Sequence, residues 1–239
     1  NLDDDLTEYI VNHRYSTSLD SSVFDKKSAD EIILCLNYDG LYGINNINRF
    51  LQESNPNEPI ELGIQRFKVG DPVLFNENER FRTGVYNNMK GKIRSIEIVD
   101  EDEPQERIVF DVELEKVIDG MDAFGADFML VDDEYPDAEN SVIRFYVNKL
   151  KSTDEDDDNS ACDVIPFQVA YAVSIHKAQG LEYSSVKIVI TDEVDELITH
   201  NIFYTAITRA QKKLKIYYTF FTRIRMKTKR RVCIIVKSV

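Results

Sequence analysis

The pattern of apolar and polar positions divides the chain into three stretches of different periodicity. Residues 32–36 form a short apolar run that ends at a loop containing Gly40, and the apolar positions that follow recur at helical spacing until Pro56. From residue 67 to residue 150 the alternation has a period of two, which is typical of strands with one buried face. Beyond Phe167, helical and strand patterns alternate again.

The stretch beyond Phe167 predicts four elements. They are a helix through Val169, Val173 and His176 that ends at Gly180, a strand over 186–190, a helix over about 201–212 and a strand over 214–218. Strands that alternate with helices favour a parallel sheet. The fold class predicted for this part of the chain, together with the strand and helix before Pro56, is therefore α/β with a parallel sheet.

The middle stretch predicts a small antiparallel barrel or curled sheet inserted into the α/β domain. Its period of two is clearest at Ile108, Phe110, Val112 and Leu114, and again at Ile143, Phe145 and Val147. Turn residues occur at Gly70–Asp71–Pro72, at Asn87–Asn88 and at Gly91. Acidic runs at 100–103, 132–134 and 154–158 are expected to be solvated connections rather than metal sites.

Composition restricts the class of function. Of 239 residues, 43% are hydrophobic and 30% are charged, which is typical of a globular protein, and the formal net charge is −14. Because affinity for phosphates comes mainly from clustered Lys and Arg, a free-standing nucleic-acid binder is not expected, and any such contact must be local. The basic tail beyond Phe221 could touch phosphates or could be a solvated extension.

The cysteines and the hydropathy favour the cytoplasm. Cys35, Cys162 and Cys233 are odd in number and far apart, so they predict reduced intracellular thiols rather than disulfides or metal ligands. No apolar run approaches the roughly 20 residues that cross a bilayer, so no membrane span is expected.

Two segments carry the candidate chemistry: AYAVSIHKAQGLEY at 170–183 and FYTAITRAQKKL at 203–214. On the predicted helix of the second segment, Thr205, Arg209 and Lys212 share one face. A guanidinium held on a packed helix suits bidentate contact with phosphate, although an isolated arginine of this kind is more often a simple surface residue.

Together the two segments closely resemble motifs V and VI of superfamily 1 helicases, above all the RecD-like and UvrD-like branch. The order of the motifs, the strand between them and the 25 residues from Gly180 to Thr205 all fit that pattern. The resemblance continues upstream, over roughly residues 32–219. IILCLNYDGLYGINNINRFLQESNP at 32–56 is similar to the start of the second RecA-like domain, and FKVGDPVLFNEN and VYNNMKGKI are similar to strands that open an SH3-like insert.

The chain departs from the family pattern in two places. The barrel turn of the family usually contains Asn-Gly, whereas this chain has Asn87–Asn88, and asparagine also tolerates the left-handed backbone. The arginine of motif IV has no clear counterpart, since the surroundings of Arg14 do not match well. The first departure concerns loop detail, and the second leaves motif IV unassigned.

The resemblance implies a role for particular residues. Arg209 would be the arginine finger that reaches the γ-phosphate of ATP held by the first RecA-like domain, which lies outside this sequence. The nucleotide cleft would be lined by Gln179, Gly180, Glu182 and Thr205. Single-stranded DNA would lie near Ser174, His176 and Lys177. No residue is expected to ligate a metal.

The sequence also predicts what these residues cannot do alone. The phosphate-cradling pattern GxxxxGK[ST] occurs nowhere among the 239 residues, so ATP and Mg²⁺ are expected to bind only in the full-length enzyme and not to this fragment. An arginine finger stabilises a nucleotide bound elsewhere. The fragment is therefore expected to be inactive as an ATPase, while the resemblance implies 5′ to 3′ movement of the full-length enzyme on single-stranded DNA.

The predicted organisation has five parts. They are an N-terminal connecting segment (1–31), a second RecA-like domain without a P-loop (32–66 and 160–219), an inserted SH3-like barrel (67–150), an acidic linker (151–159) and a basic tail (220–239). One alternative is a DNA- or protein-docking module whose helicase motifs are vestigial. Another, a stand-alone hydrolase that uses His176, lacks a nucleophile elbow and metal-ligand spacing.

Overall fold

A computed structural model describes the following parts of the chain: residues 23–24, 30–40, 42–62, 65–76, 81, 84–99, 105–120, 123–124, 126–150, 164–190 and 199–218. The chain divides into two compact units, one formed by residues 1–54 and 171–239 and the other by residues 55–170. Most of the predicted N-terminal connecting segment (1–31), the acidic linker (151–159) and the basic tail (220–239) lie outside the described residues. No helix among the described residues has the length and apolar character that crossing a membrane requires.

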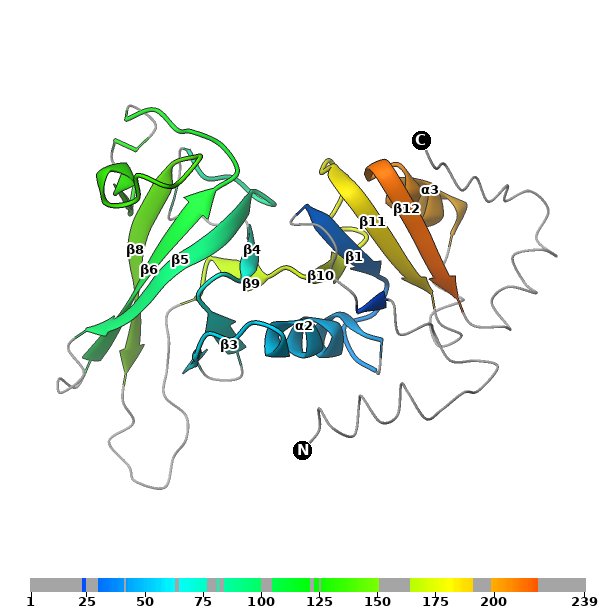
Figure 1. The fold of residues 1–239 in the computed structure, drawn as a ribbon, viewed down its shortest axis with the longest axis horizontal. Coiled ribbons are helices and arrows are strands. Elements are labelled where there is room, and N and C mark those ends of the chain that lie inside the picture. The colour runs from blue at the N-terminus through cyan, green and yellow to red at the C-terminus, as the bar shows by residue number, and fades with distance from the viewer. Residues whose placement is uncertain are drawn as a thin grey trace, which may run out of the picture. The chain divides into compact units, whose positions relative to one another are not determined.

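The first unit is an α/β sheet of four parallel strands (Figure 1). In chain order its elements are β1 (Glu31–Cys35), α2 (Ile44–Glu53), β10 (Ala172–Ser174), β11 (Tyr183–Ile190), α3 (His200–Ile207) and β12 (Ala210–Tyr218). The strands lie in the order β10-β1-β11-β12, and every neighbouring pair is parallel. This confirms the parallel sheet that the alternating strand and helix patterns predict.

The strands and helices of this sheet follow from the burial of their side chains. Four of the five residues of β1 are buried, as are seven of the eight residues of β11, so both central strands have near-continuous apolar runs. The amphipathic helix α2 buries Ile44, Ile47 and Leu51 at the spacing of one helix face. It also contacts β10 through Asn48, whose side-chain amide donates to Ala172 O at 3.0 Å and accepts from Ala172 N–H at 2.7 Å.

The helix predicted through Val169, Val173 and His176 is wrong. Phe167–Val169 forms β9, residues 172–174 form β10, and residues 175–180 form turns. Short apolar runs cannot be assigned to helix or strand by periodicity alone, and Val173 on β10 is buried with 0% exposure. Here the β-branched side chains and the burial on both faces favour the strand.

The helix predicted over 201–212 ends early. α3 stops at Ile207, and β12 begins at Ala210, where Tyr183 is its register partner on β11. Lys212 therefore lies on a strand. The prediction that it shares a helix face with Arg209 is wrong. The alternation KLKIYY that follows favours an extended chain, and pairing with β11 decides where the helix ends.

The second unit consists of two antiparallel sheets. Its elements are β2 (Pro59–Leu62), β3 (Gln65–Lys68), β4 (Pro72–Phe75), β5 (Lys90–Val99), β6 (Gln105–Leu114), β7 (Met129–Leu130), the short 3-10 helix η3 (Asp132–Glu134), β8 (Val142–Leu150) and β9 (Phe167–Val169). One sheet has the order β7-β8-β6-β5-β4-β9, and the other pairs β2 with β3. This confirms antiparallel strands in the middle of the chain.

The core of this unit is rich in phenylalanine. Ile108, Phe110 and Val112 on β6 are buried, and so are Phe145 and Val147 on β8, which confirms the period of two. The ring of Phe167 on β9 has its centroid within 6.0 Å of those of Phe67, Phe75, Phe110 and Phe145. Edge-to-face contacts of this kind add to the burial of apolar area.

The predicted turns are correct at two places and wrong at one. Gly70 (φ 91°) follows β3, and Asn88 (φ 65°) precedes β5, so both use the left-handed backbone. Gly91, however, lies inside β5. A Cβ atom at this position would lie 2.8 Å from Val112 Cγ1, so the glycine is needed for close approach to β6 and not for a turn.

A buried carboxylate connects two of the segments that carry the family resemblance. Asp71, which has 0% exposure, accepts hydrogen bonds from Lys68 N–H and from the Asn55 amide, both at 2.9 Å. Asn55 also donates to Val69 O at 2.9 Å and accepts from Lys68 Nζ at 2.7 Å through its backbone carbonyl. Hydrogen bonds thus join the segment at Asn55–Pro56 to the segment at Gly70–Asp71 within this unit.

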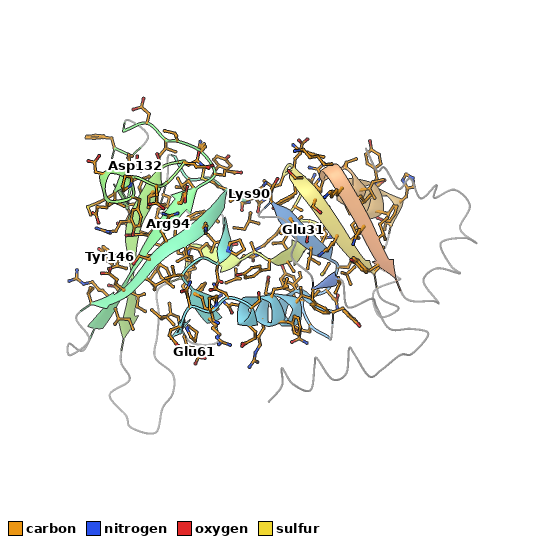
Figure 2. The ribbon with its side chains drawn as sticks, viewed as in Figure 1. Glu31, Glu61, Lys90, Arg94, Asp132 and Tyr146 are labelled. Carbon is orange, nitrogen blue, oxygen red and sulfur yellow. The ribbon has the colours of Figure 1, made fainter. Side chains whose placement is uncertain are left out.

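The acidic run at 132–134 is exposed, as predicted, and it also makes specific contacts. Asp132 Oδ1 accepts from Val142 N–H at 2.6 Å, and the Glu134 carboxylate pairs with Arg144 at 2.8 Å. These bonds hold η3 against β8, and Figure 2 shows Asp132 on this unit. Local sequence could not indicate them, because the partners lie ten residues further along the chain.

Candidate functional site

The predicted site residues lie at two opposite edges of the parallel sheet. Ser174 is the last residue of β10 and pairs with Cys35, the last residue of β1, so it lies at the carboxyl edge. Arg209 immediately precedes β12 and lies at the amino edge. The connection 175–182 runs from the carboxyl end of β10 to the amino end of β11. The structure thus brings Gly180 and Glu182, but not Ser174, to the edge where Arg209 lies.

The side chain of Arg209 is held by three hydrogen bonds. Its Nε donates to Thr205 O at 3.0 Å, its Nη1 to Leu181 O at 2.9 Å and its Nη2 to Thr208 Oγ1 at 3.0 Å. Its backbone carbonyl accepts from Tyr183 N–H at 2.9 Å. A guanidinium has five N–H groups, and the remaining two, one on each terminal nitrogen, have no acceptor among the residues that the structure describes.

This geometry places the guanidinium beside two other predicted residues. Leu181, whose carbonyl accepts from Arg209, lies between Gly180 and Glu182 in the chain. The Glu182 carboxylate accepts a hydrogen bond from Gln211 Nε2 at 2.8 Å, and both of these side chains are exposed. The guanidinium therefore contacts the residue between Gly180 and Glu182, at the amino end of β11.

Two residues of this edge were not predicted from the sequence. Thr208 contacts the Arg209 guanidinium, and Gln211 contacts Glu182. The position of Thr208, directly before the arginine at the end of a helix, could have suggested its contact. The contact of Gln211 depends on the pairing of β11 with β12, which a local pattern does not reveal.

The turn residues that were predicted to contact DNA or nucleotide differ in how exposed their side chains are. Ser174 is 6% exposed, and its hydroxyl accepts from Lys177 N–H at 3.2 Å, so it stabilises the turn. His176 and Gln179 are exposed, and Gln179 N–H donates to His176 O at 3.2 Å. Burial lowers the pKa of the half-buried Lys177 ammonium, because desolvation disfavours its charged form.

Gly180 allows a test of the backbone of this connection. Its φ is 86°, and no heavy atom of the described residues lies within 4 Å of an added Cβ. Gly180→Ala is therefore expected to lower the free energy of unfolding by about 1 kcal/mol through backbone strain alone. Gly180→Asn should lower it less, because asparagine tolerates this conformation. Urea unfolding of the chain checks both, and equal losses for the two variants would contradict the explanation.

No cluster of His, Cys, Asp and Glu side chains that could hold a metal ion occurs within the described ranges. What the amino edge offers is a fixed cation with two available N–H groups. Such a group is suited to two oxygen atoms of a phosphate, since planar guanidinium binds them bidentately.

Comparison with known proteins finds one matching family model and several similar proteins. Residues 169–217, which include both motifs, match the model of the UvrD-like helicase C-terminal domain. The RecBCD enzyme subunit RecD of Buchnera aphidicola subsp. Schizaphis graminum is 21% identical over 210 residues, or 82% of this chain and 27% of that protein. An uncharacterised protein of Methanocaldococcus jannaschii is 33% identical over 114 residues, or 44% of this chain and 9% of that protein. The chain thus spans 27% or less of the length of these relatives.

Among solved structures, Bacteroides Pif1 bound to single-stranded DNA is similar with a TM-score of 0.46 and 16% sequence identity. The alignment covers 90% of this chain and 49% of the Pif1 chain.

Proposed function

We propose that this chain, which contains a superfamily 1 helicase C-terminal domain of the RecD-like and UvrD-like type, is the second motor half of an ATP-dependent DNA helicase. The observation that supports this best is the fixed guanidinium of Arg209, with one available N–H on each terminal nitrogen. In the full-length protein Arg209 would contact the γ-phosphate of ATP bound by a first RecA-like domain.

ATP and Mg²⁺, which that first domain would bind, would supply the phosphoryl group and the charge that holds it. The residues of this chain stabilise the transfer. Negative charge grows on the oxygens around the transferred phosphoryl group, and a guanidinium already oriented toward them stabilises it without further reorganisation. Gly180, Glu182, Gln179 and Thr205 would form the rest of this side of the nucleotide cleft.

We further propose that single-stranded DNA passes the carboxyl edge of the sheet at the turn that begins at Ser174. His176 is exposed and Lys177 is half-buried there, so both can reach a phosphate or a base. Closure of two RecA-like domains on ATP and reopening after hydrolysis would advance the strand. Because the net charge is −14, this contact must be local and sensitive to salt.

The 239-residue chain alone is expected to show no ATP turnover above background, because it contains no phosphate-binding loop. Phosphate release should be measured with and without single-stranded DNA. The full-length protein, assayed in parallel, should hydrolyse ATP and respond to the DNA. Sustained hydrolysis by the purified 239-residue chain would show that a nucleotide site exists within it and would refute this division of roles.

A further inference from the structure

We propose that Thr208 is a positioning residue for the arginine finger, and this proposal rests on the function proposed for Arg209. Thr208 is the residue that follows α3 and precedes the arginine. Its hydroxyl contacts both the end of the helix and the guanidinium. It would act on catalysis through Arg209 and not by touching the phosphate.

The hydrogen-bond partners determine which way the hydroxyl is oriented. Thr208 Oγ1 lies 3.0 Å from Tyr204 O and 3.0 Å from Thr205 O, and both carbonyls can only accept. It also lies 3.0 Å from Arg209 Nη2, which can only donate. The hydroxyl proton therefore points to the helix, and an oxygen lone pair faces the guanidinium. Both capacities of the side chain are used at once.

Thr208 completes a set of three acceptors around the guanidinium. Each of the three guanidinium nitrogens has one acceptor, since Thr205 O holds Nε, Leu181 O holds Nη1 and the Thr208 hydroxyl holds Nη2. Two of these acceptors are backbone carbonyls, which no substitution removes directly. The Thr208 hydroxyl is thus the side-chain contact that orients the plane in which the two available N–H groups lie.

Orientation of this kind affects the chemical step more than binding. A guanidinium that is already in place stabilises the transition state, whereas one that must first be ordered loses part of that stabilisation. ATP itself would be held by the other RecA-like domain. Loss of the Thr208 hydroxyl should therefore lower kcat and leave the KM for ATP and the affinity for single-stranded DNA nearly unchanged.

The test compares three variants of the full-length protein. Thr208→Val removes the hydroxyl and keeps the shape, and Thr208→Ser keeps the hydroxyl. Thr199→Val is the matched control, because Thr199 caps the other end of α3 by accepting from Ile202 N–H at 3.2 Å and does not contact Arg209. Helix destabilisation alone would affect Thr199→Val as much as Thr208→Val. Thermal melting establishes that each variant is folded.

We expect Thr208→Val to lower kcat by about 10-fold, with KM unchanged, while Thr208→Ser and Thr199→Val stay within about 2-fold of the parent protein. Thr208→Val should also weaken binding of ADP–aluminium fluoride, which resembles the transferring phosphoryl group, and not binding of ADP. An unchanged kcat in Thr208→Val, or an equal loss in Thr199→Val, would overturn the positioning role. If Arg209→Ala is also fully active, the proposed function itself fails.

Discussion

Arg209→Ala in the full-length protein is expected to lower ATP turnover by a factor on the order of 10³ or more, as removal of an arginine finger does in phosphoryl-transfer enzymes. The guanidinium lies at the amino edge of β12 with three of its N–H groups bound within the domain. Alanine removes the charge that would meet the γ-phosphate. Phosphate release at saturating ATP and single-stranded DNA measures the effect.

Arg209→Lys distinguishes charge from geometry. Lysine keeps a positive charge but cannot fill three acceptors in one plane, so most of the activity should still be lost. Lys212→Ala is the matched control. The sequence pattern placed Lys212 on the same helix face as Arg209, whereas it is an exposed residue of β12, and its replacement should leave turnover unchanged.

The result at Arg209 also decides between the proposed function and the docking-module alternative. If the motor residues were vestigial, Arg209→Ala would leave turnover of the full-length protein as it is. Binding of single-stranded DNA should be kept in the variant, because the proposed DNA contacts follow the carboxyl end of β10, at the other edge of the sheet. Full turnover in a folded Arg209→Ala protein would exclude the arginine-finger role.

The features that the sequence predicts well are those that depend on local periodicity. The alternation at Ile108, Phe110 and Val112 and the nearly continuous apolar run of β11 both correspond to strands in the structure. In a run of this length, alternating burial is explained by a strand with one buried face. The strand between the two motifs was also predicted, and it is β11 in the structure.

The predictions that failed concern elements whose structure is decided by partners distant in sequence. The segment from Phe167 to Ser174 is short and largely apolar, and its pairing with β4 and β1 makes it two strands. The end of α3 was misplaced because pairing of β12 with β11 competes with further helix. The hydrogen bond between Gln211 and Glu182 depends on the same pairing. Each error reflects tertiary contacts overriding a local preference.

A buried ion pair in the first unit was likewise not predicted. Lys187 Nζ on β11 lies 2.7 Å from Glu31 Oε1 on β1, and their side chains are only 3% and 7% exposed. The ammonium also donates to Val23 O at 3.2 Å, and the carboxylate accepts from Ser185 Oγ at 2.6 Å. Glu31 is labelled on the sheet in Figure 2. Charges this deeply buried depend on each other, because each would be costly to desolvate alone.

Glu31→Leu is therefore expected to lower the free energy of unfolding of the first unit by about 3–5 kcal/mol, since it leaves the Lys187 ammonium buried without its carboxylate. Adding Lys187→Met should restore most of the loss, because a well-packed apolar pair of similar volume replaces the ions. Hydrogen exchange at the β11 amides reports on this unit specifically.

The surface pair of Glu134 and Arg144 provides the comparison. Glu134 is 55% exposed, so Glu134→Ala should cost about 1 kcal/mol or less. If Glu31→Leu costs no more than this surface variant, the buried pair is not an interdependent unit. If the double variant is as unstable as the single one, packing around the introduced leucine and not the uncompensated charge explains the loss. Recovery of stability in the double variant therefore distinguishes an electrostatic cause from a packing cause.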